Sequence, residues 1–461
     1  DHRSKTQTTK IFSQNQTYPR LYQPLTDSIL HHILSFLPTE DAIKTSVLSK
    51  SWYRLWTFAS DLSFYNRGGI KRVRDFVAFV RETLNLYSCV KLDKFLIDFE
   101  YSSRYSYYVN KWVRFTTTHK VENLYLEFYG TEKANTSRPS YLLPRLLCTN
   151  STLKLLSLRF CKFATKPTIC WTSLTVLRIS CASLTHDMIQ NILLGSPALT
   201  ELRLYNFVLQ EGGHKFYEPE KLELDGEEDR AKNYGYATVE ISAPNLLFLS
   251  ISGFMYKRKF QLTNVLSLVE AKLSFECKSN DYGRNPSYLI YRNDLRELLL
   301  KLLHIPKLTI STWCLQLDKW NLPGIANLLQ SLPYLEKLVI NLVPSYNSEV
   351  RFYFLEYWKS QNREFGCLSQ HLNTVEIVGF EAKCFGLKYL TGLVQFLLKH
   401  ARVLEKLVIY GKAEASNQTP TLLEACRLCE VTSLCILISF AILVYKYTMP
   451  AWMMMIKIWW L

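Results

Sequence analysis

The chain has 461 residues, of which 48% are hydrophobic and 14% are aromatic, and this composition excludes an intrinsically disordered protein. A chain of this length can bury more than one core. Its 55 basic and 40 acidic residues give a formal charge of +15, but the basic residues are scattered along the chain, which favours a solvated surface over a nucleic-acid-binding patch.

The 12 cysteines lie between Cys89 and Cys435 without the dense, regular spacing of a disulfide-stapled secreted domain. We therefore expect reduced thiols, in a protein of the nucleus or the cytoplasm. The C-x-x-C pair Cys426 and Cys429 has no second pair and no nearby histidine, so we expect no zinc site. No apolar stretch follows the basic first residues, and we expect no signal peptide.

The first predicted elements are three short helices in "LTDSILHHILSFLPTEDAIKTSVLSKSWYRLW" (25–56). Apolar residues at helical spacing predict a helix over 29–37 that stops at Pro38. Thr39 is a candidate cap for a second helix with acidic residues in its first turn. A third short turn over 52–56 brings two tryptophans and a leucine together.

These helices carry more apolar surface than they can bury, because domains below about 40 residues rarely fold alone. They could be the first hairpin of a larger core, or they could face another protein. The second interpretation is favoured by a resemblance to the F-box of plant F-box proteins, which covers essentially the whole segment. It is carried in order by Leu25, Asp27, Ile29-Leu30, Ile33-Leu34, Leu37-Pro38, Asp41-Ala42, Thr45-Ser46, Leu48-Ser49-Lys50, Trp52 and Leu55-Trp56.

The resemblance implies that the segment docks on a Skp-type adaptor and, through it, on a cullin-based ubiquitin ligase. Two positions depart from the family pattern: Thr26 stands where proline is usual, and Ser51 stands where arginine is usual. The residues assigned to adaptor binding, some of which must instead hold the helices together, are Leu25, Ile29, Ile33, Leu34, Leu37, Pro38, Ile43, Val47, Leu48, Ser49, Lys50, Trp52, Leu55 and Trp56.

Beyond residue 60 the chain alternates between predicted helices and strands. The stretch "RDFVAFVRETL" (74–84) places apolar residues on one helical face, and "KFLIDFE" (94–100) alternates like a strand. An L-x-x-L-x-L pattern then recurs, in which residues two apart share one face of a strand. Its copies are "LKLLSLRFC" (153–161), "LTVLRIS" (174–180), "LTELRLYNF" (199–207), "LLFLSISGF" (246–254) and "LEKLVI" (335–340).

Five copies favour leucine-rich repeats over unrelated buried strands, and they predict an irregular solenoid used for protein recognition. The first leucines of four successive copies are 21, 25 and 47 residues apart, which fits a polar insertion (211–236) that we expect to form a surface loop. Four residues beside the strand leucines are candidates for binding a target protein, or else ordinary surface residues: Arg159, Arg178, Arg203 and Tyr205.

Near the end of the repeats, a predicted strand, helix and strand resemble the FBD module of plant F-box/leucine-rich-repeat proteins. The matching pieces are His371-Leu372, Thr374-Val375-Glu376-Ile377, Gly379-Phe380 and Ala401-Arg402-Val403-Leu404-Glu405-Lys406. Capping the open end of the solenoid is a sufficient physical role for this module.

The last residues, from 413 to 461, change abruptly in composition. The run "VTSLCILISFAILVY" (431–445) is shorter than the roughly 20 residues that span a bilayer, although the apolar stretch continues past Lys446. Three interpretations remain open: a membrane anchor, a strand and helix that extend the FBD module, or a segment translated from an incorrect gene model.

No catalytic motif is recognisable. The sequence has no G-x-x-x-x-G-K-[ST], G-x-G-x-x-G, H-E-x-x-H or G-x-S-x-G pattern, and the adjacent His31 and His32 are better explained as partly exposed positions of the first helix than as metal ligands. We therefore expect no enzyme, no cofactor and no metal. A scaffold with weak or no adaptor binding, membrane-associated through its tail, is the alternative to a ubiquitin ligase receptor.

The predicted fold is α/β, with a three-helix F-box followed by a leucine-rich-repeat solenoid and a C-terminal FBD module. The expected segments are a disordered basic tail (1–24), the F-box (25–60), the solenoid (61–365), the FBD module (366–412) and the apolar tail (413–461).

Overall fold

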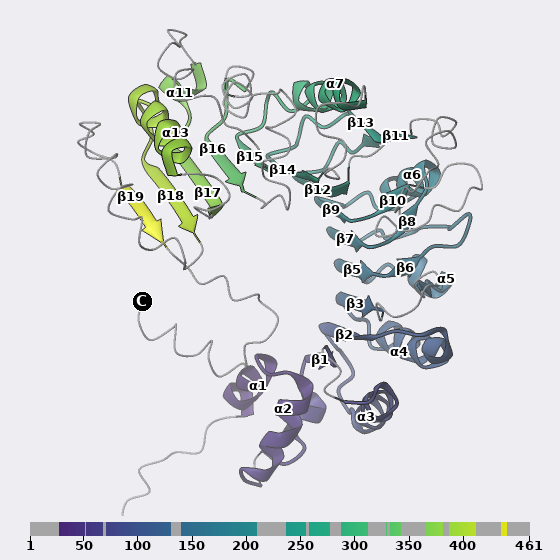
Figure 1. The fold of residues 1–461 in the computed structure, drawn as a ribbon. Helices are drawn as coiled ribbons and strands as arrows, with labels where there is room; N and C mark the ends of the chain where they lie inside the picture. The colour runs from purple at the N-terminus through teal and green to yellow at the C-terminus, as the bar shows by residue number, and fades with distance from the viewer. Residues whose placement is uncertain are drawn as a thin grey trace, which may run out of the picture.

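The computed structural model describes residues 27–50, 52–67, 71–130, 140–209, 237–254, 258–276, 287–311, 329, 332–342, 366–380, 387–411 and 435–439. Within these residues the strands form one thirteen-stranded sheet in which every neighbouring pair is parallel. The sheet curves into an open arch, with helices along its outer side and a small helical module at its first strand (Figure 1). The fold is therefore α/β with a parallel sheet, as predicted.

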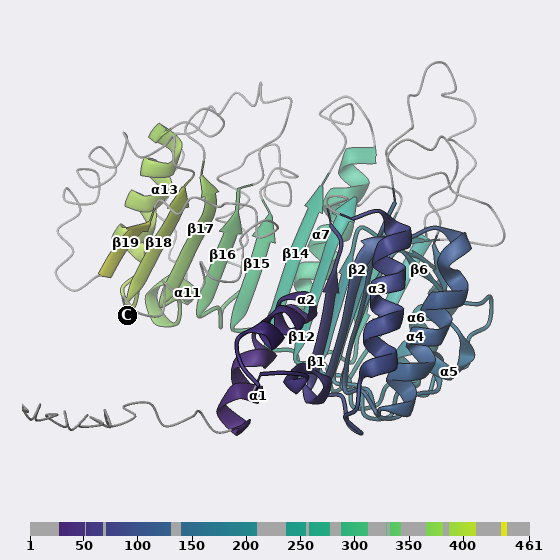
Figure 2. The same ribbon diagram turned by 90° about the horizontal axis from the view of Figure 1, so that it is seen from below.

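The N-terminal module (residues 27–60) contains two α-helices, α1 (Asp27–Ser35) and α2 (Thr39–Lys44), and two 3-10 helices, η1 (Thr45–Val47) and η2 (Leu55–Phe58). The third predicted turn is thus a 3-10 helix that begins after Trp52. The prediction that Thr39 caps α2 is wrong, because Thr39 is the first residue of α2 and its hydroxyl makes no capping bond. Figure 1 shows the module at the β1 end of the sheet, and Figure 2 shows it beside β1 from below.

The strands of the large sheet follow one another in chain order. They are β1 (Asp61–Tyr65), β2 (Lys94–Glu100), β3 (Asn123–Tyr129), β5 (Leu155–Arg159), β7 (Val176–Ser180), β9 (Glu201–Tyr205), β12 (Phe248–Phe254), β14 (Glu270–Glu276), β15 (Lys307–Ser311), β16 (Lys337–Asn341), β17 (Thr374–Phe380), β18 (Lys406–Gly411) and β19 (Cys435–Ser439).

Helices and three small two-stranded sheets cover the outer side. The helices are η3 (Ser103–Tyr105), α3 (Val73–Leu86), α4 (Ser106–Thr118), α5 (Arg145–Cys148), α6 (His186–Leu194), α7 (Ser287–Leu300), α11 (Gly366–Gln370) and α13 (Leu387–His400). The small sheets pair β4 (Tyr141–Leu142) with β6 (Cys161–Lys162), β8 (Ser183–Leu184) with β10 (Val208–Leu209), and β11 (Ala237–Ser242) with β13 (Arg258–Thr263).

The repeat leucines form the core between the sheet and its outer helices. Leu156, Leu177, Leu202 and Leu249 occupy equivalent positions on β5, β7, β9 and β12, and each is at most 2% exposed. The predicted helix over 74–84 and the predicted strand over 94–100 are α3 and β2. Residues on either side of these leucines point to the opposite face of the sheet, which lines the inside of the arch and is called the inner face below.

Each repeat turns after its strand through one residue in the left-handed conformation. Phe160, Cys181 and Asn206 follow β5, β7 and β9 with φ of 52°, 50° and 46°. Their backbone N–H groups donate to carbonyl groups of the next strand, for example from Cys181 to Tyr205 at 3.0 Å. The turns therefore join neighbouring repeats beyond the ends of the strands.

The C-terminal strand, helix and strand predicted over 374–406 are β17, α13 and β18. Residues 435–439 of the tail form β19, which pairs with β18 and extends the sheet. This agrees with the strand, though not with the helix, of the interpretation in which the tail extends the FBD module. The rest of the tail, the pair Cys426 and Cys429, the insertion (211–236) and the basic tail (1–24) lie outside the described residues. Among the described cysteines, Cys148 and Cys367 are buried free thiols.

Candidate interaction surfaces

The N-terminal module has a hydrophobic core of its own. Leu34, Ala42 and Trp56 are buried together, and this cluster is separate from the core of the sheet. The half-buried side chains of Leu37, Ile43, Trp52 and Leu55 pack against it. These side chains stabilise the module, so Leu34 and Trp56 are not available to a partner.

Other apolar side chains of the module are exposed. Val47 is 87% exposed, Leu48 64% and Ile29 46%, and Ser49 and Lys50 lie beside them in the exposed loop after η1. The structure thus divides the predicted adaptor residues between core and surface, with Ile33 and Pro38 half-buried and Leu25 outside the described residues.

Sequence reasoning missed three exposed aromatic residues of the same module. Phe36, Tyr53 and Phe58 are 67%, 63% and 53% exposed. The edge of the His32 ring meets the Phe36 ring at a centroid distance of 4.8 Å. These residues lie outside the periodic apolar positions of the predicted helices. The only sequence signal for them was that large aromatic side chains stand at positions where the helical period places solvent-facing residues. We define the module surface as Ile29, Phe36, Val47, Leu48, Tyr53 and Phe58.

The module is fastened to the first strand of the sheet. The Thr39 hydroxyl accepts a hydrogen bond from the backbone N–H of Ser63 on β1 at 2.7 Å, and Thr39 is buried. The Lys71 ammonium lies 2.6 Å from a carboxylate oxygen of Glu40. The hydrogen bond from Lys71 lowers the pKa of Glu40. Thr39 thereby satisfies a backbone donor on an edge strand, where unpaired groups otherwise invite pairing with other chains.

Three of the four predicted target-binding residues form one cluster on the inner face. Arg178 and Arg203 are neighbours in the register of β7 and β9, and both donate to Oε1 of Glu201. Burial alone raises the pKa of Glu201, but the bonds and charges of the two arginines outweigh it, and the net shift is downward. Arg203 also lies 3.5 Å from the hydroxyl of Tyr205.

The fourth predicted residue, Arg159, lies on β5 near a half-buried acid, Glu127, and a buried one, Asp98. In the sheet register Asp98 on β2 pairs with Glu127 on β3, and Glu127 pairs with Arg159. Asp98 bonds to Arg67 at 3.2 Å. Two buried atoms of this row, Oδ1 of Asp98 and Nε of Arg159, find no hydrogen-bond partner among the described residues. The inner face thus carries polar groups whose hydrogen bonds the fold does not complete.

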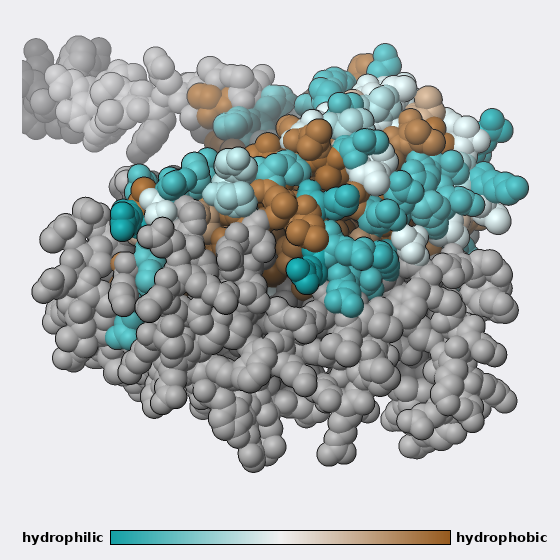
Figure 3. All heavy atoms as spheres, turned by 90° about the horizontal axis from the view of Figure 1, so that it is seen from above, coloured by the Kyte–Doolittle hydropathy of each residue, from teal (hydrophilic) through white to brown (hydrophobic). Residues whose placement is uncertain are grey.

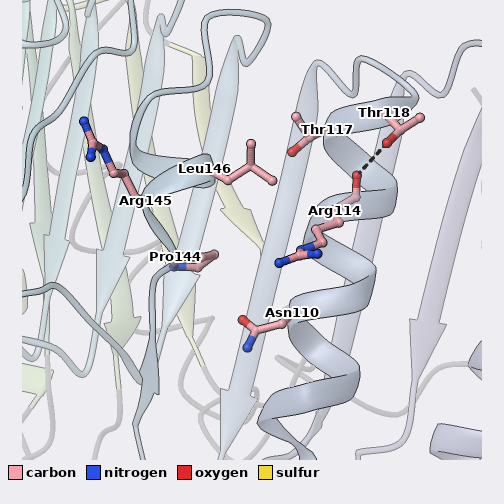
Figure 4. A pocket seen from close by; sticks show the side chains of 7 residues that line it. All are labelled: Asn110, Arg114, Thr117, Thr118, Pro144, Arg145 and Leu146. Atoms are coloured by element: carbon pink, nitrogen blue, oxygen red, sulfur yellow. Dashed lines mark hydrogen bonds between the residues drawn. The ribbon is translucent and has the colours of Figure 1, made fainter.

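A shallow hollow on the outer side lies between α4 and α5 (Figure 4). Its volume is about 710 Å³, and Arg114, Arg145 and Asn110 contribute to its lining. Both arginines are exposed, and neither is held by an acid in the described residues. Figure 3 shows that hydrophobic side chains also gather among hydrophilic ones on the face seen from above. We assign no site to the hollow between α4 and α5 or to the mixed surface of Figure 3.

The described residues contain no helix that is long and apolar enough to cross a membrane. They also contain no group of three or more histidines, cysteines or acids placed to hold a metal ion. A membrane anchor was one of three interpretations of the tail and would use residues 435–461. Of these, residues 435–439 form β19, and the rest lie outside the described part of the chain.

Comparison with protein families finds three matches along the chain. A family model described as the F-box domain matches residues 24–60, one described as the At1g61320/AtMIF1 LRR domain matches residues 84–208, and one described as FBD matches residues 365–409. Their order is the order predicted from the sequence.

Several proteins of Arabidopsis thaliana are similar over most of their length. The F-box protein At5g03100 is 30% identical over 307 residues, which are 64% of this chain and 89% of the relative. The F-box/FBD/LRR-repeat protein At2g04230 is 28% identical over 405 residues, 83% of this chain and 87% of the relative. The F-box/LRR-repeat protein At5g02910 is 28% identical over 355 residues, 69% and 71% of the two chains.

Proposed function

The chain belongs to the plant family of F-box/LRR-repeat proteins, and on this premise we propose that it is the non-catalytic, substrate-recruiting subunit of a Skp-cullin-F-box ubiquitin ligase. In this role the N-terminal module binds a Skp-type adaptor, and the repeats hold a target protein. The contribution to catalysis is proximity, because the target's lysines are brought close to the conjugating enzyme of the ligase. Such a subunit acts in the nucleus or the cytoplasm.

The observation that carries the proposal is the module surface. Six large apolar side chains of a module of about thirty residues are exposed although the module has a complete core of its own. We propose that these side chains form one interaction site, because exposed apolar surface that gathers in one place marks such sites, and aromatic and aliphatic anchors dominate the energy of helical interfaces. Within the predicted adaptor residues, we assign binding to Ile29, Val47 and Leu48, with Ser49 and Lys50 beside them.

We also propose the division of the chain on which this function depends. Residues 25–60 form the F-box, in which η2 takes the place of the third predicted helix, and residues 366–412 form the FBD module. Between them, residues 61–365 form a leucine-rich-repeat solenoid, supported by the equivalent leucines and left-handed turns of successive repeats. The inner face of this solenoid is the proposed target surface, where Arg159, Arg178, Arg203 and Tyr205 lie.

Co-expression of the full chain with a Skp-type adaptor, followed by size-exclusion chromatography, tests the adaptor assignment. We expect the wild type to co-elute with the adaptor and Val47→Asp to lose at least about 2 kcal/mol of binding free energy, which removes co-elution. Val90→Asp is the matched control, because Val90 is exposed by the same 87% as Val47 but lies in the loop before β2. A folded wild-type chain that elutes without the adaptor would contradict the proposal.

That last outcome would favour the alternative, a scaffold protein that works through its repeats without an adaptor. Leu34→Ala separates the two roles of the module in the same experiment. Leu34 is only 1% exposed and belongs to the module core. Its truncation should lower the stability of the module by about 2–5 kcal/mol, whereas Val47→Asp should leave it unchanged.

A further inference from the structure

We infer that the target docks through an anionic group, a carboxylate or a phosphate, on an arginine cluster of the inner face formed by Arg159, Arg178 and Arg203. The inference rests on the proposed function, since it gives the chemistry by which the repeats would recognise a target. The three arginines lie on the consecutive strands β5, β7 and β9.

One carboxylate holds two of the three arginines in place. Oε1 of Glu201 accepts from Nε and Nη2 of Arg178 at 3.3 and 3.2 Å and from Nε of Arg203 at 2.6 Å. Two guanidinium groups share one carboxylate, so these three residues keep a charge of +1. In the described part of the chain, Nη1 of Arg178 and Nη2 of Arg203 donate no hydrogen bond, and the side chains are 35% and 29% exposed. Both arginines therefore retain donors for a ligand.

Aromatic groups restrict Arg203 further. Its guanidinium lies over the ring of Phe248 on β12, 4.5 Å from the ring centroid, and Nη1 is 3.5 Å from the hydroxyl of Tyr205. A guanidinium that is already ordered loses less conformational entropy when it binds an anion. Arginine and tyrosine are also the residue types that dominate the energy of protein interfaces.

Arg159 adds a third cation on the neighbouring strand. It pairs with Ser180 in the register of β5 and β7, two residues beyond Arg178. Its Nε is buried and has no acceptor among the described residues. A guanidinium with an unsatisfied nitrogen is costly in a partly buried site, and an anion bonded to its outer nitrogens would offset that cost.

The charged groups that bond to the cluster or adjoin it in the sheet register also favour an anion. The four cations around the cluster outnumber its three acids, which gives a net charge of +1. These groups are Arg67, Arg159, Arg178 and Arg203 against Asp98, Glu127 and Glu201. The acids are occupied by Arg67, by the hydroxyl of Ser157 and by the two arginines of the cluster.

Binding of the full chain, co-purified with the adaptor, to an array of 12-residue peptides tests the inference. The peptides carry glutamate, phosphoserine, glutamine or lysine at their centre in an otherwise randomised sequence. We expect the wild type to bind glutamate or phosphoserine peptides more strongly than glutamine peptides. In the double variant Arg178→Gln/Arg203→Gln, this preference should fall by at least about tenfold. Binding to phosphoserine but not glutamate would identify phosphate as the anion.

Removing two positive charges from a basic chain weakens the binding of acidic ligands wherever on the surface they bind. A matched control is therefore needed. Arg114→Gln/Arg145→Gln removes the same two charges from the outer hollow and should keep the preference (Figure 4). Equal losses in both double variants, or no preference in the wild type, would overturn the inference. If the inner-face double variant does not fold, the same preference is measured for Arg159→Gln. This variant should fold, because Nε of Arg159 makes no hydrogen bond among the described residues. Adaptor co-elution in the same preparation reports separately on the proposed function.

Discussion

At the scale of single residues, Asp98 is an acid of the inner face whose ionised form is poorly solvated. It is 6% exposed, and Oδ1 has no hydrogen-bond partner among the described residues. Its pKa is raised to about 6, chiefly by burial and also by the charge of Glu127, while the charges of Arg67 and Arg159 oppose the shift. Strained or unsatisfied groups of this kind concentrate at functional surfaces, where binding rather than stability decides which residue is kept.

The raised pKa of Asp98 predicts a pH dependence of stability. Between pH 4 and 6 the folded chain binds the proton more tightly than the unfolded chain, so the free energy of unfolding falls as the pH rises through this range. We expect Asp98→Asn to raise the free energy of unfolding at pH 7.5 by about 1–3 kcal/mol and to change it little at pH 4. Urea denaturation at both pH values measures the difference.

The control for this experiment is Asp75→Asn, since Asp75 is an exposed acid on α3. It should leave the pH dependence of the wild type unchanged. If Asp98→Asn unfolds with the same pH profile as the wild type, Asp98 does not titrate in the way that its burial implies.

At the scale of elements, the left-handed turns set the geometry from repeat to repeat. Cys181 has φ of 50° after β7, and the equivalent position after β9 is Asn206. Asparagine tolerates this conformation better than other residues with a side chain, and β-branched residues tolerate it worst. We expect Cys181→Asn to stabilise the chain by up to about 1 kcal/mol and Cys181→Val to destabilise it by about 1–2 kcal/mol. In thermal unfolding, the melting temperature of Cys181→Asn should therefore lie above that of the wild type and that of Cys181→Val below it. The reverse order would contradict the role of the turn.

The bond between α2 and β1 is the second feature at this scale. Thr39→Val keeps the shape of the side chain but leaves the N–H of Ser63 without its acceptor, and a buried unpaired donor costs about 1–3 kcal/mol. We expect faster amide hydrogen exchange at β1 and in α2. Thr118→Val is the control, because the Thr118 hydroxyl bonds only to the exposed carbonyl of Arg114 in the same helix (Figure 4). Unchanged exchange at Ser63 in Thr39→Val would show that the bond does not fasten the module.

At the scale of the whole molecule, two separate hydrophobic cores predict two units of unfolding. The module core around Leu34 and the sheet core around Leu249 share no buried residue. Leu249 is fully buried in the middle of the sheet, so Leu249→Ala should cost about 2–5 kcal/mol there. We expect this variant to raise hydrogen exchange across β9, β12 and β14 and to keep adaptor binding. Loss of protection in the module to the same extent would mean that the two cores unfold together.

The position of the module relative to the arch has a consequence for the proposed function. The module is joined to β1 at one end of the sheet, so an adaptor bound to the module surface lies near the first strands (Figures 1 and 2). The arginine cluster lies on β5, β7 and β9, in the same half of the sheet. A target held there would therefore stand close to the ligase rather than at the far end of the repeats.

The sequence alone determined the order of the modules and the buried positions of the repeats. The burial of residues such as Leu156, Leu177 and Leu202 can be predicted from the local sequence, because alternation along a strand determines which side chains share a face. The helical spacing of apolar residues predicted α3, and the alternation along a strand predicted β2. It also placed Arg178 and Arg203 on the face opposite the leucines.

Only the tertiary structure decided which partners these residues meet. Arg178 and Glu201 are 23 residues apart in the chain, and Thr39 and Ser63 are 24 apart, so no local pattern connects them. The same holds for the module, where Leu34 is buried and Val47 is exposed although both are apolar residues of short helices. Periodicity reports one face of one element, whereas burial and pairing depend on what a distant part of the chain brings to that face.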